Sequence, residues 1–228
     1  MNLTIESVFK QDEATAFCGD VAKGVSLSQK CRALTGYAAA GCALYGFSMG
    51  LQHSLLQAAS SAAKVFCLFG LTLAICLPTL HFIGLLFGAR VRLEQTLTVL
   101  LGGVSLTGTL LGAFAPISLF FLFSGSSYEF LLLLHVAVFS FCGGAGLLSV
   151  RRNMREIAGR AEDDDEARRR SNRLMNVWFG VYMFIGAQMS FILSPFVGRS
   201  EEFFFLVSKK GDFFSYVFDA MLRFLGGS

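Results

Sequence analysis

The sequence predicts an all-α protein, a polytopic transmembrane helix bundle of about five spans, on three observations. Hydrophobic residues make up 54% of the 228 residues and charged residues only 15%, whereas soluble domains carry roughly 25% charged residues. Lys, Arg, Asp and Glu are absent from residues 33–63, 65–89, 97–128, 130–150 and 174–198. Each stretch has the 18 or more residues that a helix needs to cross about 30 Å of hydrocarbon. A soluble protein of this composition would have too little polar surface to cover its core.

Residues 1–32 are predicted to form a short cytoplasmic N-terminal region. The first residues, MNLTIESVFKQDE, include acidic side chains and lack a basic segment followed by an apolar core. They therefore do not have the pattern of a cleavable signal peptide.

The predicted bundle covers residues 33–195, with spans at about 33–51, 65–87, 97–123, 130–150 and 174–194. The first span is rich in Ala and Gly, and the segment QHSLLQAASSAAK after it can extend a helix or lie at the membrane interface. The span count is therefore five, or four if the first segment does not cross. Pro78 and Pro116 lie inside spans, where a proline kinks a helix and frees a carbonyl group.

The connector at residues 151–173 is the most charged part of the chain, with eight arginines and six carboxylates. Arg and Lys in short loops stay on the cytoplasmic side of a membrane. With the connector inside, alternation of the spans also places the N-terminus and the loop with Arg90 and Arg92 inside. Most of the 19 basic residues are then cytoplasmic, which predicts an N-in and C-out orientation.

Arg168, Arg169 and Arg170 each follow a carboxylate by four residues, the order that stabilises a helix. They can serve topology and solubility, or form a cytoplasmic docking surface for a partner protein or anionic lipid. The interleaved acidic residues cancel the basic field, so no nucleic-acid partner is predicted.

Three polar side chains within the spans are candidates for functional contacts: His81, His135 and Gln188. Counted at about 1.5 Å per residue, His81 lies toward the cytoplasmic side, and His135 and Gln188 lie at similar depths toward the outer side. The two histidines are therefore too far apart to share a metal ion. His135 and Gln188 can instead hydrogen-bond across the fourth and fifth spans, near Pro116. Such a contact can serve packing or line a proton or substrate path.

Two glycine pairs, Gly46/Gly50 and Gly108/Gly112, predict close helix packing. Small residues let helix backbones approach, which matters because lipid gives helices no hydrophobic drive to pair. The contacts can be within the chain or between copies of it.

Residues 196–228 are predicted to form an extracytoplasmic amphipathic tail. After Asp212, an apolar residue recurs at helical spacing at positions 214, 217, 218, 221, 222 and 225. This helix can lie on the outer membrane surface, on the bundle, or in the groove of a partner.

No enzymatic activity, metal or cofactor is predicted. The six cysteines show no CxxC spacing, so neither a disulfide nor a zinc site is expected. The sequence also lacks the common hydrolase, metalloprotease and nucleotide-binding motifs.

Two segments, KVFCLFGLTLAICLPTLHFIGLLFGARVRLEQTL (64–97) and GAQMSFILSPFVGR (186–199), resemble a family of uncharacterised bacterial multi-pass inner-membrane proteins. The shared features are a Lys that opens the second span, a Leu-Pro break, a Gly-x-Arg turn and Pro-Phe-Val-Gly after the last span. The five-span layout is also similar to that of Yip1-type membrane proteins, which act as non-enzymatic trafficking or scaffolding factors. The Asp-Leu-Tyr-Gly-Pro element of that type does not occur in the N-terminal region, so no functional residue is carried over.

The sequence therefore predicts a non-enzymatic integral protein of the bacterial inner membrane. Its expected role is that of a scaffold or assembly subunit of a membrane complex, and its expected partners are the lipid bilayer and either another protein or a second copy of the chain. The alternative function is that of a channel, transporter or membrane-perturbing effector with a polar path through the third to fifth spans.

Overall fold

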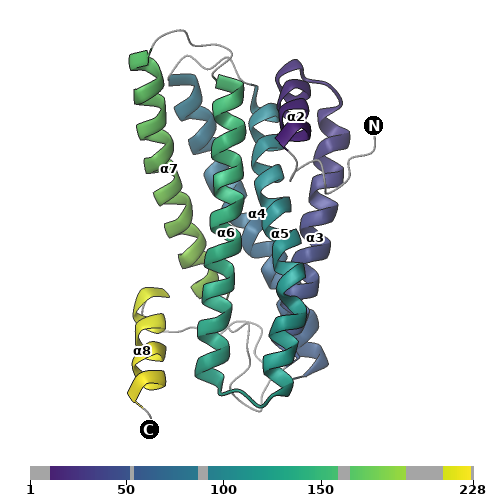
Figure 1. The fold of residues 1–228 in the computed structure, drawn as a ribbon, viewed down its shortest axis with the longest axis vertical. Helices are drawn as coiled ribbons and strands as arrows, with labels where there is room; N and C mark the ends of the chain where they lie inside the picture. Colours follow the sequence, from purple (N-terminus) through teal and green to yellow (C-terminus); the bar gives the residue numbers. More distant parts are fainter. Residues whose placement is uncertain (1–10, 52–53, 87–91, 159–164, 194–212, 227–228) are drawn as a thin grey trace.

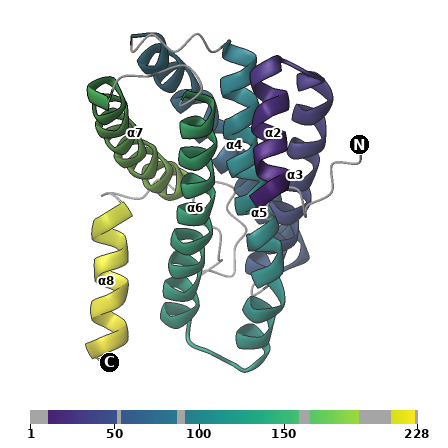
Figure 2. The same ribbon diagram turned by 45° about the horizontal axis from the view of Figure 1, so that its top comes forward.

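A computed structural model describes residues 11–51, 54–86, 92–158, 165–193 and 213–226 of the chain. This described part contains helices and no strand. In chain order the helices are α2 (Gln11–Lys23), α3 (Leu27–Gly50), α4 (Leu55–Leu86), α5 (Leu93–Phe123), α6 (Tyr128–Ala158), α7 (Asp165–Ile192) and α8 (Phe213–Gly226). Five long helices run side by side, with α2 at one end of the bundle and α8 beside the other end (Figures 1 and 2). The all-α prediction is confirmed.

Within the described parts of the chain, four helices are long and apolar enough to cross a membrane. The qualifying stretches are Leu55–Phe82, Leu93–Phe123, Tyr128–Ile157 and Met175–Ile192. They correspond to the second to fifth predicted spans and are those of an integral membrane protein. The first predicted span lies within α3, which is not among the four, and α3 packs against α4 and α5 (Figure 1).

The helix of the second predicted span begins at Leu55, earlier than its predicted start at residue 65. This start of α4 lies within the segment QHSLLQAASSAAK. The hydroxyl of Ser54 accepts a hydrogen bond from the Gln57 N–H at 3.1 Å, which satisfies one of the donors that a helix start leaves open. The polar segment is therefore the first part of α4, apart from residues 52 and 53, which lie outside the described residues.

Glycines set the close packing of α3 against its neighbours. A Cβ at Gly46 would lie 2.6 Å from the Ser61 carbonyl oxygen of α4, and one at Gly108 would lie 2.8 Å from the Ala38 carbonyl oxygen of α3. Gly50 also meets the α4 backbone, at Ala58, and a Cβ at Gly112 would lie 3.2 Å from the Gly41 Cα. In the structure both predicted glycine pairs thus lie at contacts within the chain.

A second crossing, between α5 and α6, also depends on small residues. A Cβ at Gly103 would lie 2.9 Å from the Gly146 carbonyl oxygen. The Thr107 hydroxyl donates to the carbonyl of Gly103 at 3.0 Å and approaches that of Cys142 on α6 at 3.3 Å. The α3, α4, α5 and α6 helices therefore form the tightly packed part of the bundle.

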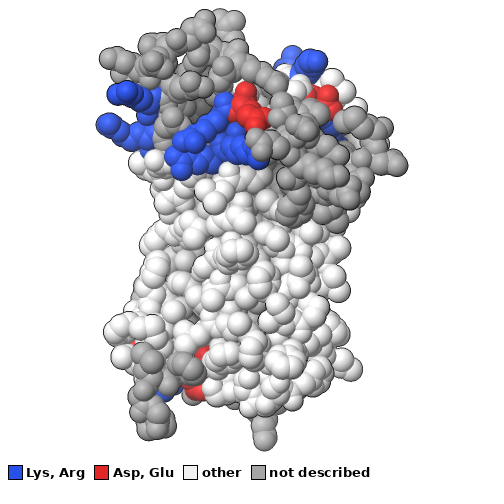
Figure 3. Space-filling model, viewed as in Figure 1, with Lys and Arg blue, Asp and Glu red and all other residues white. Residues whose placement is uncertain are grey.

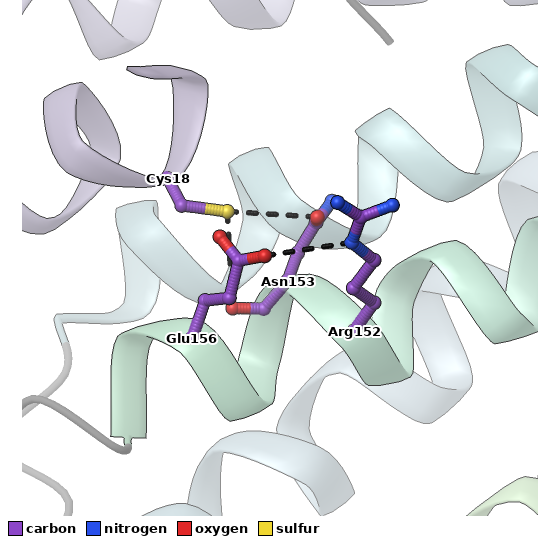
Figure 4. Close-up of polar contacts among 4 residues, drawn as sticks. All are labelled: Cys18, Arg152, Asn153 and Glu156. Carbon is purple, nitrogen blue, oxygen red and sulfur yellow. Dashed lines mark hydrogen bonds and ion pairs between the residues drawn. The ribbon is translucent and has the colours of Figure 1, made fainter. Parts of the chain in front are cut away.

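The N-terminal helix α2 is folded against the end of this packed part. The Gln95 amide of α5 donates to the Val21 and Ala22 carbonyls at 2.8 and 3.0 Å. Cys18 lies 3.5 Å from the Asn153 side-chain oxygen of α6, beside an ion pair between Arg152 and Glu156 (Figure 4). These contacts join residues far apart in the chain and hold α2 against α5 and α6.

The start of α3 is joined to α2 by an ion pair. The buried Lys30 ammonium lies 2.9 Å from an Asp20 carboxylate oxygen and 5.5 Å from the centre of the Phe17 ring. The hydrogen bond from Lys30, and then its positive charge, hold the pKa of the Asp20 carboxyl below its usual value.

Charged side chains gather at the α2 end of the bundle, above a broad uncharged surface (Figure 3). Acidic and basic side chains also occur at the opposite end, where the view shows far fewer of them. This distribution is typical of a helix bundle whose middle is in hydrocarbon. The predicted N-in and C-out orientation and the count of five spans remain predictions.

Candidate functional site

The intramembrane histidine of α6 is paired with a tyrosine of α3. The Tyr45 hydroxyl and the His135 Nδ1 are 2.8 Å apart, and both residues are buried. The two rings meet edge to face with centroids 5.6 Å apart, and Phe139, one turn farther along α6, also meets the Tyr45 ring edge to face at 5.5 Å. The pair thus connects α3 and α6 in the core.

The predicted pairing of His135 with Gln188 is not formed. The hydrogen bonds of the described residues join His135 to Tyr45 and none joins it to Gln188. The reason is that α7 packs mainly on α4 and not on α6, so equal depth does not bring the two side chains together. Gln188 is half-buried on α7. Tyr45 was not among the candidates predicted from the sequence. Its hydroxyl, a polar group within an uncharged Ala/Gly-rich span, could have identified it.

Trp178 is the main anchor of α7 on α4. Its side chain is 1% exposed, and its indole N–H donates to the Cys76 carbonyl at 3.3 Å. That carbonyl lies two residues before Pro78, so the contact is at the proline break of α4. Tyr182 continues the contact with a ring centroid 5.4 Å from that of Trp178.

The remaining candidate positions lie apart from the Tyr45–His135 pair. His81 is half-buried on α4 and its nearest recorded aromatic neighbour is the adjacent Phe82, at 6.4 Å between ring centroids. Pro116 is exposed on the outer face of α5. Arg168, Arg169 and Arg170 lie in the first turns of α7, where Arg169 is exposed.

A buried polar stripe on the first turns of α4 was also missed. Gln57, Ser60, Ser61 and Lys64 follow one another at helical spacing, and Lys64 is only 3% exposed. The Ser60 hydroxyl has no hydrogen-bond partner among the described residues. The sequence did contain an indication of this stripe, because Lys64 is the one charged residue between two long uncharged stretches.

A cavity of about 550 Å³ lies between α4, α6, α7 and α8. His135 is on its wall, together with the aromatic side chains of Phe69 and Phe139. The cavity exists because α7 packs on α4 and α8 packs on α6, which leaves α6 and α7 apart. The volume is in the range of small-molecule pockets, about 300–1,000 Å³.

Comparison with protein-family models, curated proteins and solved structures found no match to this chain. The resemblance of the two quoted segments to bacterial multi-pass proteins therefore remains a prediction. Among the described residues, no three His, Cys, Asp or Glu side chains are grouped so as to hold a metal ion.

The Tyr45–His135 hydrogen bond is expected to stabilise the bundle measurably. Tyr45→Phe should lower the free energy of unfolding by about 1 kcal/mol, because hydrogen bonds inside membrane proteins average about 0.6 kcal/mol and a buried unpaired group adds to the loss. His135→Leu should cost a similar amount, and the double variant less than the sum of the two. Thermal unfolding of the three variants in detergent measures this coupling. Strictly additive effects would mean that the two side chains do not interact.

Proposed function

We propose that the protein is a five-span integral protein of the bacterial inner membrane that acts, without catalysis, as an assembly subunit of a membrane complex. Its N-terminus and the Arg-rich connector are cytoplasmic, and α8 is on the outer side. The partner contributes a transmembrane helix that docks on α7. The alternative function, a channel or transporter, needs a polar path that the separation of His135 from Gln188 does not favour.

The observation that carries this proposal is the low burial of α7. Only 6% of the residues of Met175–Ile192 are buried, against 33%, 28% and 33% in the three other apolar helices. The helix is nevertheless anchored through the buried Trp178. A helix that is held by one fully buried side chain, while its other described side chains are half-buried or exposed, is suited to contact a further helix.

One face of α7 has the composition of a helix-docking stripe. Val177, Val181, Phe184, Gln188 and Ile192 follow at intervals of three or four residues and so share a face. The four apolar members of this stripe are exposed. Gln188 is the one polar side chain on it, and a glutamine facing hydrocarbon gains most when a neighbouring helix offers it a hydrogen bond.

The charges at the start of α7 favour a different protein over a second copy of this chain. Two copies in one membrane have the same orientation, so their α7 helices could pair only in parallel. Such pairing brings the exposed Arg169 and Arg173 of each copy near their own counterparts, which is unfavourable. A partner helix with acidic residues at its cytoplasmic end would meet the same arginines with the opposite charge.

The placement of charge supports the proposed orientation. The basic side chains of α2, of the end of α6 and of the start of α7 lie at one end of the bundle (Figure 3). If α3 also crosses the membrane, α2 and the connector are on the same side, as the rule for basic loops requires.

A photo-crosslinking residue at position 188, introduced into the protein in its native membrane, tests the docking helix. We expect one partner protein to be crosslinked and identified by mass spectrometry. Gln188→Leu should weaken co-purification of that same protein about 3- to 18-fold, the factor that corresponds to an interhelical hydrogen bond of about 0.6–1.7 kcal/mol.

Ser190→Ala is the matched control, because Ser190 is a polar residue of the same helix that lines the cavity and does not belong to the stripe. It should leave co-purification unchanged. A triple change of Arg168, Arg169 and Arg170 to Ser should also weaken the complex. Crosslinking of a second copy of the chain would contradict the choice of partner. Ion or solute transport by the pure protein in liposomes, without a partner, would instead favour the channel or transporter.

A further inference from the structure

The cavity between α4, α6, α7 and α8 occupies only one half of the bundle. On α6 its lining extends from Tyr128 to Gly143, although the helix continues to Ala158. On α7 it begins at Gly180, although the helix begins at Asp165. The lined part of each helix is therefore the part farther from the charged connector.

Most residues that line the cavity lie within apolar helices of membrane length. Its α6 residues belong to the stretch Tyr128–Ile157 and its α7 residues to Met175–Ile192. None of the described residues that line it is Lys, Arg, Asp or Glu, and most are aliphatic, aromatic or glycine. A charged headgroup would have no counter-charge among these residues, so the chemistry favours an uncharged hydrocarbon occupant.

The shape of the cavity favours a single chain. Tyr128 and Gly143 are separated by about 22 Å along α6 at 1.5 Å per residue, which exceeds the roughly 15 Å of one bilayer leaflet. A volume of about 550 Å³ along that length suits one extended hydrocarbon chain.

The first turns of α8 form the cavity wall at the end away from the connector. Phe213, Phe214 and Tyr216 all line the cavity. Phe214 stacks with Phe184 of α7 at 6.3 Å between ring centroids, and the Tyr216 hydroxyl lies 3.1 Å from that of Tyr128 at the start of α6. Figure 2 shows α8 beside this half of α6. The helix thus joins α6 and α7 across the cavity.

We infer that this cavity binds one acyl chain of a membrane phospholipid, which enters from the leaflet at the α8 end and reaches with its terminal methyl toward Gly143 and Gly180. The phospholipid headgroup stays in the interface at that end, outside the uncharged walls. The inference depends on the bilayer around the four apolar helices and is independent of the partner proposed for α7. The two can therefore fail separately.

The probe is a phosphatidylcholine with a diazirine near the end of one acyl chain, reconstituted in vesicles with the full-length protein. After illumination, mass spectrometry of the peptides locates the crosslinks. We expect crosslinks at the cavity-lining residues Phe139, Ser140 and Gly143 of α6 and Gly180, Tyr182 and Met183 of α7. Crosslinks confined to exposed lipid-facing side chains such as Phe141 and Leu148, with none at the cavity-lining Phe139 or Tyr182, would overturn the inference.

Two neighbouring glycines provide a matched pair of variants. A Cβ at Gly143 or at Gly144 meets no atom within 4 Å, so both positions accept a side chain, but only Gly143 lines the cavity. Gly143→Leu should abolish the crosslinks at Tyr182 and Gly144→Leu should leave them unchanged. Gly180→Leu, at a second open cavity position, repeats the test from α7 in case the first variant does not fold.

A photoreactive free fatty acid distinguishes the two sources of an acyl chain. Crosslinking of the cavity by the phospholipid is the expected result. Crosslinking by the fatty acid with none by the phospholipid would overturn the assignment to a membrane phospholipid. Equal loss of crosslinks in Gly143→Leu and Gly144→Leu, with both variants monodisperse, would mean that the labelled site is not this cavity.

Discussion

Gly41→Ala is expected to destabilise the bundle, whereas Gly36→Ala on the same helix is expected to stabilise it. A Cβ at Gly41 would overlap the Gly108 carbonyl of α5, whereas a Cβ at Gly36 meets no atom within 4 Å. Both changes raise helix propensity by up to about 1 kcal/mol. At Gly41 two backbones would have to move apart, and overpacking costs about 1–3 kcal/mol or more.

Thermal unfolding in detergent, followed by circular dichroism, separates the two outcomes. For a chain of this size, each kcal/mol shifts the midpoint by about 2–4 °C. Gly41→Ala should lower the midpoint and Gly36→Ala should keep or raise it. The same direction of change in both variants would contradict the close α3–α5 crossing.

Trp178→Ala is expected to detach α7 from α4. Loss of a buried tryptophan side chain costs about 3–5 kcal/mol, and the lower part of that range is expected here because lipid chains can cover the apolar surface that is uncovered. The variant also removes the donor that bonds the Cys76 carbonyl. Since α7 has few other buried residues, no other contact of similar size replaces this one.

Alkylation of Cys76 reports the detachment directly, because this thiol is 1% exposed in the intact bundle. A membrane-permeant maleimide should modify Cys76 in Trp178→Ala and leave it unmodified in the parent protein, as located by mass spectrometry. Val177→Ala is the control, because Val177 is 61% exposed on the same helix and should not affect Cys76. Protection of Cys76 in both variants would mean that other contacts hold α7.

The low burial of α7 has consequences for both proposals. The same helix lines the cavity, presents the Gln188 stripe and carries Trp178, and Phe184 belongs to both the stripe and the cavity wall. A partner helix at the stripe would stabilise the position of α7 and hence the wall of the lipid cavity. The effect of the partner on lipid binding can therefore be measured by comparing phospholipid crosslinking with and without the partner.

Most of the helix positions could be predicted from the sequence. The uncharged stretches at residues 97–123 and 130–150 lie within α5 and α6. Such stretches mark membrane helices because each charged residue placed in hydrocarbon carries its own free-energy cost. The boundary of α4 was predicted less well. Its first turns carry Gln57, Ser60, Ser61 and Lys64, whose polarity left open whether the segment lies at the interface or extends a helix. Neighbouring helices bury these side chains.

The contacts between helices could be predicted only in part. The glycine pairs pointed to close approaches, and their partners were identified only when α3 lay against α4 and α5. His135 is a buried polar group that the sequence offered as a candidate, but depth along the span could not select Tyr45 over Gln188. The hydrogen-bond partner of His135 depends on which helices are neighbours of α6. Depth along the span does not identify it, because residues on every side of the bundle can lie at the same depth.

Hydropathy and the spacing of charges were therefore sufficient to identify a membrane-length helix bundle with a charged end, because each span interacts with lipid residue by residue. The packing of α7 on α4, the Tyr45–His135 pair and the cavity behind α8 were decided by the tertiary structure alone. They depend on side chains from different helices fitting together, and no single stretch of the chain contains that information.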